Sequence, residues 1–343
     1  MKCRAYLLAG MACALAVGGH CPEARGESPG LALYATIPEP DLIPEGIAFD
    51  AATRTLYVSS IRKRKIVALS PEGTAREFVA SGQDGVWSVL GMKIDAEHRT
   101  LLACSEVDGP GMEGFSPGDL GKSAVFEFDL ESGKALHVFR APAGGRHLFN
   151  DLVFTRGGVI YVTDSEEGTV WKIDRRSGRV ARFAPAGHLV YPNGIAIDPE
   201  ERTLFVADDR SIHAVDLASG TRRELAHSPR TKLGQADGLY FDGGALVAIQ
   251  NGTPPIRVVR FSLSKRHDRV TGEMVLASAD PRLSEPTTGA IAGDRMYLVG
   301  DAQLRAVGKD GKIWPREKLS PVKIYAMPLR AAPPPPGSPG SYR

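Results

Sequence analysis

The chain has 343 residues, of which 43% are hydrophobic and 24% are charged, and these are ordinary values for a globular protein. Glycine and proline together make up about 18% of the chain, against roughly 12% of an average protein, which indicates many turns. The net charge of +2 and the lack of basic runs argue against a nucleic-acid partner or an anionic membrane surface.

Residues 1–26 have the pattern of a signal peptide. Lys2 and Arg4 precede an apolar stretch at 5–17, and a small-x-small pattern follows at 24–26. We expect cleavage near Gly26 and a periplasmic or secreted protein with no membrane contact after cleavage, because no later apolar run is long enough to span a bilayer. A buried first helix is the alternative for this stretch, and a lipid anchor on one of its cysteines lacks the usual sequence context.

Cleavage at this point would leave Cys104 as the one cysteine of the mature chain. It ends the apolar run 101–104, so we expect a buried side chain that acts as a small hydrophobe and not as a nucleophile. The same cleavage removes more basic than acidic residues and leaves the two in equal number.

The rest of the chain repeats itself. Residues 44–50 (PEGIAFD) are followed by RTLYV, and residues 192–198 (PNGIAID) are followed by RTLFV after the same interval. Four weaker copies begin at Leu90, Asn150, Asp237 and Thr288. Consecutive copies start 43 to 60 residues apart, which is close to the length of one propeller blade.

Each copy predicts four short strands separated by tight turns, with no helix-period stretch of useful length. Six copies predict an all-β protein with one domain at 31–330, a six-bladed β-propeller. The segment 31–37 precedes the first blade, and we expect it to supply the outer strand of the last blade, so that no sheet edge is left open. The proline-rich tail 331–343 is predicted to be disordered.

The repeat register identifies candidate metal ligands. The first strand of a blade lines the central tunnel, so the residues that open these strands face the axis at one rim. Their position is held by Glu45, Leu90, Asn150, Asn193, Asp237 and Thr288. Two carboxylates and two amides among them match one hard divalent cation, with calcium as the first candidate and magnesium, manganese or zinc as alternatives.

Two other interpretations of these residues stay open. Glu-Gly, Asn-Gly and Asp-Gly are ordinary turn dipeptides. The side chains could also form a hydrogen-bonded tunnel without a metal, although uncompensated carboxylates there would be costly.

Four short motifs resemble the metal-ligand motifs of the senescence-marker protein, gluconolactonase and luciferin-regenerating-enzyme family, and they occur in the family's order. The similarity extends over nearly the whole mature chain. Paraoxonase and diisopropylfluorophosphatase are more distant relatives of this family. The motifs are Pro44-Glu45-Gly46, Phe149-Asn150-Asp151, Pro192-Asn193-Gly194 and Asp237-Gly238.

The resemblance implies that Glu45, Asn193 and Asp237 are direct ligands and that Asn150 is a ligand or a substrate contact. It also implies hydrolysis of lactones or related esters, with Asp237 as base or nucleophile. Members that act on sugar lactones tend to carry an arginine two residues before the Asn150 position, where this chain has Leu148, which argues against a polyhydroxylated sugar acid as the substrate.

Other candidates surround these motifs. His147 and His188 lie a few residues before Asn150 and Asn193, so either one, or Asp237, could take a proton from water; each histidine could equally be an ordinary rim residue. Further polar residues are expected at the same rim, namely Asp164, Tyr191, Asp208, Arg210, Gln250 and Asn251. The long loop 105–122 is either a lid over the site or a surface insertion.

The sequence therefore predicts an exported, monomeric, metal-dependent hydrolase that acts on a small lactone or ester. No G-x-S-x-G elbow, phosphate-binding loop or H-E-x-x-H motif offers a different chemistry. A non-catalytic binding propeller and an enzyme of the strictosidine-synthase type are the alternatives, because propellers host many functions.

Overall fold

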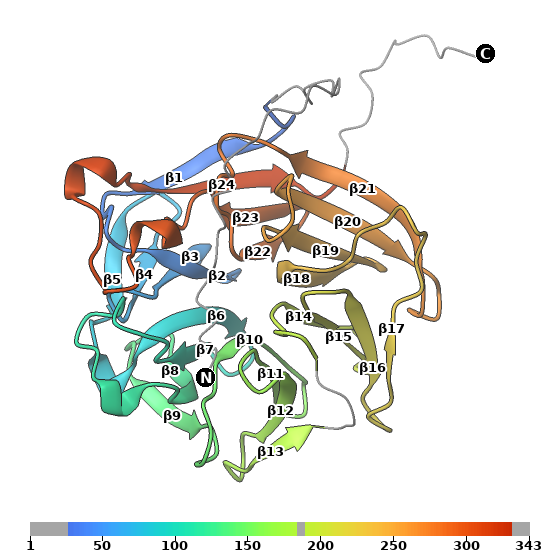
Figure 1. Ribbon diagram of the computed structural model, residues 1–343, viewed down its shortest axis with the longest axis horizontal. Coiled ribbons are helices and arrows are strands. Elements are labelled where there is room, and N and C mark those ends of the chain that lie inside the picture. Colours follow the sequence, from blue (N-terminus) through green and yellow to red (C-terminus); the bar gives the residue numbers. More distant parts are fainter. Residues whose placement is uncertain (1–26, 184–188, 331–343) are drawn as a thin grey trace.

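The computed structural model describes residues 27–183 and 189–330, which form six four-stranded sheets arranged as a ring (Figure 1). The prediction of a six-bladed all-β propeller is confirmed. The expected signal peptide at 1–26, the tail at 331–343 and His188 lie outside the described residues.

Each blade is an antiparallel sheet whose strands follow one another in the chain, from the tunnel outward. Blade one has β2 (Pro44–Asp50), β3 (Thr55–Ser60), β4 (Lys65–Leu69) and β5 (Ala75–Val79). Blade two has β6 (Ser88–Asp95), β7 (Thr100–Glu106), β8 (Ser123–Asp129) and β9 (Ala135–Arg140). Blade three has β10 (Phe149–Phe154), β11 (Val159–Asp164), β12 (Thr169–Asp174) and β13 (Val180–Phe183).

The second half of the ring repeats this order. Blade four has β14 (Ile195–Ile197), β15 (Thr203–Ala207), β16 (Ile212–Asp216) and β17 (Arg222–Glu224). Blade five has β18 (Ala236–Asp242), β19 (Ala245–Gln250), β20 (Arg257–Leu263) and β21 (Val270–Ser278). Blade six has β22 (Gly289–Ala292), β23 (Arg295–Val299), β24 (Val322–Pro328) and β1 (Ala32–Ile37).

The ring is closed by its first strand, as predicted. β1 pairs antiparallel with β24, with Ala32 opposite Ala326 and Ile37 opposite Val322. The sheet of blade six therefore joins the beginning of the described chain to its end, which ties the ring together and covers the edge of β24.

The hydrophobic core lies between the blades. Six clusters of buried side chains each combine residues from two neighbouring blades, including the pair formed by blades six and one. Cys104 lies in the cluster between blades two and three and is fully buried, in agreement with its expected role as a small hydrophobe. Because each blade buries its two faces against its neighbours, the ring holds the six inner strands in a common register around the tunnel.

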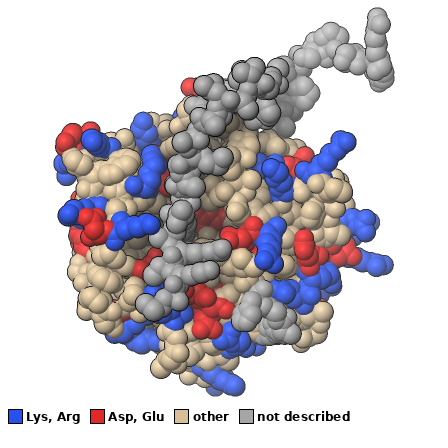
Figure 2. Space-filling view, viewed as in Figure 1, with Lys and Arg blue, Asp and Glu red and all other residues tan. Residues whose placement is uncertain are grey.

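Four single-turn 3-10 helices complete the described structure: η1 (Gln83–Gly85), η2 (Pro117–Asp119), η3 (Leu304–Ala306) and η4 (Arg316–Lys318). Within residues 27–183 and 189–330, no helix has the length and apolar character needed to cross a bilayer. Lys and Arg side chains are interspersed with Asp and Glu on the face of the ring seen in Figure 2.

Candidate metal centre at the tunnel mouth

Glycines let the inner strands approach one another closely where they begin. A Cβ atom on Gly46 would lie 2.0 Å from the carbonyl oxygen of Leu90, and one on Gly194 would lie 2.8 Å from the carbonyl oxygen of Asp237. Both distances are too short for a side chain, so glycine is required there. The residue before each of these glycines is thereby placed at the narrow mouth of the tunnel.

A second backbone feature recurs at the same positions. Ile43, Tyr191 and Gln235 have φ angles of 48°, 54° and 58°, and each lies two residues before a predicted ligand. Such left-handed angles are uncommon for residues other than glycine, and they are a genuine outlier for the β-branched Ile43. Strain of this kind concentrates at functional sites, where the surrounding structure maintains it.

Asn193 and Asp237 are in direct contact. The Nδ2 atom of Asn193 donates a hydrogen bond of 2.7 Å to Oδ1 of Asp237, and Nδ2 of Asn251 donates to the other oxygen, Oδ2. Asn251 also donates to the carbonyl oxygen of Pro286 at 2.9 Å. The Asp237 carboxylate is therefore held in one orientation by two amides, one from blade four and one from its own blade.

Glu45 enters the mouth from blade one. It is 4% exposed, and its Oε2 atom has no hydrogen-bond partner among the described residues. The hydroxyl groups of Thr287 and Thr288 both donate to its backbone carbonyl at 2.7 Å. Blade six thus fixes the backbone of Glu45, while one oxygen of its carboxylate, Oε2, has no donor among the described residues.

Asn150 belongs to the same ring of contacts but is bound differently. Its Nδ2 atom donates to the hydroxyl of Ser165 at 3.1 Å, and this hydroxyl donates to the carbonyl oxygen of Pro192 at 2.7 Å. Thr163 donates to the carbonyl oxygen of Asn193 at 2.8 Å. Hydrogen bonds therefore connect the mouth residues of blades three, four, five, six and one.

The mouth contains an unusual number of unsatisfied polar atoms. In the described part of the chain, seven buried side-chain oxygen or nitrogen atoms lack a partner, and four of them belong to mouth residues. These four are Oε2 of Glu45, Oε2 of Glu106, Oδ2 of Asp151 and Oδ1 of Asn193. Buried polar groups are normally paired, so these unpaired oxygens are the atoms of the mouth that could ligate a cation. All are hard oxygen donors, which fits a calcium, magnesium or manganese ion better than zinc.

The protonation properties of the two carboxylates agree with such a cluster. Burial raises the pKa of Asp237 to about 6, against the opposing effect of the hydrogen bonds from Asn251 and Asn193. Burial and the charge of Asp237 raise the pKa of Glu45 well above its usual value. Carboxylates that are costly to ionise are stabilised in their charged form by a nearby cation.

An ion pair lies below the mouth residues. The Nζ atom of Lys93 is 2.7 Å from Oδ1 of Asp151 and 5.5 Å from the ring centre of Tyr240, whose hydroxyl accepts a hydrogen bond from the Gly289 amide. Beyond Lys93 and Tyr240 the tunnel is a mostly apolar cavity of about 300 Å³, lined by residues such as Ile47.

His147 does not present a free nitrogen to the mouth. It is 5% exposed, its Nδ1 atom lies 2.6 Å from Oδ2 of Asp164, and its Nε2 atom lies 3.0 Å from the carbonyl oxygen of Pro142. Trp171 donates to the same Asp164 oxygen at 2.9 Å. Because both ring nitrogens already contact hydrogen-bond acceptors, the structure gives His147 the geometry of a packing residue and does not place it as a base.

Several other rim residues also have structural partners. Asp208 accepts hydrogen bonds from three backbone amides and from His213, and these bonds hold its pKa at about 2 although burial opposes them. Gln250 donates to the carbonyl oxygens of Lys232 and Gly234. Among these rim residues, Asn251 contacts a predicted ligand, Asp237.

Leu148, which replaces the arginine of sugar-lactone members, is 5% exposed and packs in the cluster between blades two and three. It therefore offers no polar contact to a substrate.

The long loop of blade two is anchored to its neighbours. Its base is closed by hydrogen bonds between Val107 and Lys122 and between Gly121 and Val107. Met112 is buried and its sulfur accepts a hydrogen bond from the amide of Ser88, while Glu113 donates its amide to the carbonyl oxygen of Arg62 in blade one. The loop thus lies against blade one on the face that carries the mouth.

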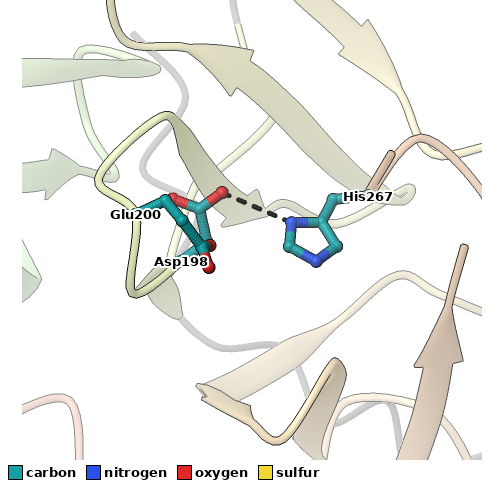
Figure 3. Close-up of side chains that lie close together, drawn as sticks. All are labelled: Asp198, Glu200 and His267. Carbon is teal, nitrogen blue, oxygen red and sulfur yellow. Dashed lines mark hydrogen bonds and ion pairs between the residues drawn. The ribbon is translucent and has the colours of Figure 1, made fainter. Parts of the chain in front are cut away.

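A different group of possible ligands lies away from the mouth. Asp198, Glu200 and His267 offer ligand atoms within 4.8 Å of one another, and could hold a divalent cation (Figure 3). These residues come from the turn after β14 and the turn between β20 and β21, at the opposite ends of the strands from the mouth.

Asp198 also has a structural role. Its Oδ1 accepts hydrogen bonds from two backbone amides of its own turn, and its Oδ2 lies 3.3 Å from Nδ1 of His267 in the next blade. The equivalent residues Asp50 and Asp95 likewise bind a side chain of the next blade, Arg99 and Arg175 respectively. We therefore interpret the contact between Asp198 and His267 as one of three ion pairs that join neighbouring blades.

Sequence reasoning missed two mouth residues. Glu106 is 3% exposed at the end of β7, and Lys93 forms the ion pair described above. Glu106 could have been found from the register, because it ends a second strand as Asp164 and Gln250 do. Lys93 carries no such signal, because nothing local distinguishes it from a surface lysine in an alternating strand.

Comparisons with known proteins agree with this arrangement. The family model described as the SMP-30/gluconolactonase/LRE-like region matches residues 43–299, about three quarters of the chain. No curated protein sequence matches.

Among solved structures, a gluconolactonase from Xanthomonas campestris is 22% identical, with a TM-score of 0.58 over 88% of this chain and 89% of that one. A luciferin-regenerating enzyme is 15% identical, with a TM-score of 0.56 over 86% and 92% of the two chains. The Mala s 1 allergen of Malassezia sympodialis is 16% identical, with a TM-score of 0.64 over 87% and 96%. At these identities the structural neighbours show the fold, while the family model covers the whole set of mouth residues from Glu45 to Asp237. The chain belongs to the SMP-30/gluconolactonase/LRE-like family.

Proposed function

We propose that the protein is a metal-dependent hydrolase that acts on a lactone or related ester at the tunnel mouth. The observation that carries the proposal is the convergence of Glu45, Asn193 and Asp237 from three blades, with buried oxygens of Glu45 and Asn193 left unpaired. These three residues would hold one divalent cation, and Asn150 would contact the cation or the substrate. A bound cation supplies Lewis-acid chemistry, in which it polarises a carbonyl and lowers the pKa of water.

The residues of the chain would divide the remaining tasks. Asp237 is suited to accept a proton from a water molecule, because its carboxylate lies at the mouth and is oriented by two amide donors. Asn193 and Asn251 keep its two oxygens oriented toward the mouth. The Lys93–Asp151 ion pair lies on the inner side of the site, so the substrate would enter from the rim.

The substrate class follows from what surrounds the mouth. With Leu148 buried where sugar-lactone members carry an arginine, the site has no charged side chain at that position to bind a polyhydroxylated acid. We therefore propose a less polar lactone or ester. The short apolar stretch after Lys2 and Arg4 supports the further proposal that the protein is exported to the periplasm or secreted.

The test combines metal analysis with turnover. The purified chain should contain one divalent ion, and hydrolysis of a panel of small lactones and esters should stop on chelation and return when calcium is added back. Asp237→Asn should fold, as judged by circular dichroism, and lose both the ion and turnover, while Glu131→Gln, the same chemical change at an exposed turn, should keep both.

The outcomes separate the candidate functions. Failure to bind any ion in metal-replete medium, or full activity of Asp237→Asn, would refute the proposal. A tightly bound ion without turnover on any substrate of the panel would favour a binding propeller over an enzyme.

A further inference from the structure

Glu106 is the last residue of β7, at the same end of blade two as the tunnel mouth. It is 3% exposed and its Oε2 atom has no hydrogen-bond partner among the described residues. A buried carboxylate oxygen without a donor is expensive, and such groups are retained where a ligand or ion satisfies them.

The strand pairing shows which way Glu106 faces. Glu106 lies opposite Ser123 of β8, and cross-strand partners share one face of the sheet. The Ser123 hydroxyl accepts a hydrogen bond of 2.9 Å from the amide of Phe149, the first residue of β10. Glu106 is therefore on the face of blade two that packs against the start of β10, beside the predicted ligand Asn150.

Electrostatics connects Glu106 to Glu45 of the neighbouring blade one. The carboxylates of Glu106 and Glu45 are close enough to repel each other, and this repulsion contributes to the raised pKa of Glu45. The charge of Arg146 also acts on Glu106, but the Arg146 guanidinium is 3.7 Å from both Asp108 and Glu166. Arg146 is thus shared between two rim carboxylates, and no ion pair joins any basic side chain of the described residues to Glu106.

The position of Glu106 also completes the repeat. Five blades present an oxygen-bearing side chain where the inner strand begins, but blade two presents Leu90 there. Glu106 lies on the second strand of the same blade, at the same end, and would supply a carboxylate oxygen to the sector where Leu90 is apolar.

We propose that Glu106 is a further carboxylate of the cation site, supplied by blade two, and that it raises the affinity of the mouth for a divalent cation. The inference rests on the proposed function, since it concerns the same ion. It assigns to Glu106 a role in holding the ion and none in proton transfer.

Calcium titration of the chelator-treated full chain by isothermal calorimetry tests this role directly. Glu106→Gln keeps the shape of the side chain and removes its charge, and it should raise the calcium Kd by about tenfold or more, the size expected when a charged partner of a metal site is lost. Glu106→Asp keeps the charge on a shorter side chain, and its calcium Kd should lie between that of Glu106→Gln and that of the wild type. Glu131→Gln should bind calcium as the wild type does.

The control readout is the unfolding temperature without calcium. It should be unchanged or higher in Glu106→Gln, because a buried unpaired charge has been removed. A folded Glu106→Gln variant with wild-type calcium affinity would overturn the inference and leave the proposed function standing. Absence of calcium binding by the wild type would overturn both. If Glu106→Gln does not fold, Glu106→Ala replaces it in the test, and wild-type calcium affinity in that folded variant would equally refute the role of this carboxylate.

Discussion

The Nδ2 atom of Asn193 lies 2.7 Å from Oδ1 of Asp237, and this hydrogen bond joins the inner strands of blades four and five at the mouth of the tunnel. The bond uses the side-chain nitrogen of Asn193, and the side-chain oxygen Oδ1 of the same amide has no partner among the described residues. One contact therefore orients both a carboxylate and an amide oxygen. A cation placed beside them would find its ligands already oriented, which reduces the cost of binding.

The orientation of Asp237 depends on Asn251 as well. Replacement by Asn251→Ala removes the donor to Oδ2, and we expect the calcium Kd to rise about 10- to 100-fold, as for other residues that orient a metal ligand. The pKa of Asp237 should also rise further, because that hydrogen bond lowers it. Calorimetry gives the affinity. Thr271→Ala, which removes an exposed hydrogen bond on β21, is the control, and equal affinities for the two variants would contradict the assignment.

Calcium affinity should depend on pH with a definite sign. The pKa of Asp237 in the cation-free protein is raised to about 6, so this carboxyl is mostly protonated below that pH and cannot act as a ligand. Protonation of Asp237 should therefore lower the affinity by up to about tenfold for each pH unit below about 6, and the raised pKa of Glu45 should add to this fall. Titrations between pH 5 and pH 8 measure this directly, and an affinity independent of pH over the range would contradict it.

The ion pair between Asp50 of blade one and Arg99 of blade two should contribute to stability without affecting calcium binding at the mouth. The two terminal nitrogens of the Arg99 guanidinium each donate a hydrogen bond of 2.9 Å to the buried Asp50 carboxylate, and these bonds lower the pKa of Asp50. Because Arg99 is half-exposed, we expect Arg99→Met to lower the free energy of unfolding by about 1–3 kcal/mol at neutral pH. The loss of stability should shrink in acid as Asp50 becomes protonated. The stabilisation from a lowered carboxyl pKa is complete above the pKa of the unfolded chain and disappears as the pH falls through the lowered pKa of the folded protein.

Urea unfolding of Arg99→Met can be compared with that of Arg156→Met. Arg156 forms a similar pair with Glu201 between blades three and four, but its side chain is 75% exposed, so its loss should cost less than about 1 kcal/mol. Equal losses of unfolding free energy in the two variants would show that burial of the carboxylate does not decide the strength of the ion pair.

Closure of the ring by β1 can be tested with two substitutions on the same strand. Ile37 is 2% exposed and packs in the cluster between blades six and one, whereas Leu33 is 55% exposed. Ile37→Ala should lower the free energy of unfolding by about 2–4 kcal/mol through lost packing and the cavity left behind. Leu33→Ala should change it by less than about 0.5 kcal/mol. Similar unfolding curves for both variants would mean that β1 adds little to the closed ring.

The number of blades, the closing strand and the residues that begin the inner strands could be predicted from the sequence, and the physical reason is repetition. Every blade must bury the same two faces and turn at the same points, so the pattern of 44–50 returns at 192–198 with only small changes. Once the strands are aligned, a residue at the start of an inner strand must face the axis. This is why Glu45, Asn193 and Asp237 could be grouped although they are far apart in the chain.

Partners between blades were decided only by the tertiary structure. A local pattern does not reveal that both nitrogens of His147 contact acceptors, that Asn251 binds Asp237, or that Oε2 of the buried Glu106 has no donor among the described residues. These facts depend on side-chain directions and on distances between strands of different blades. Repetition determines where a residue stands in its own blade, but the packing of neighbouring blades determines what that residue touches and whether its charge is satisfied.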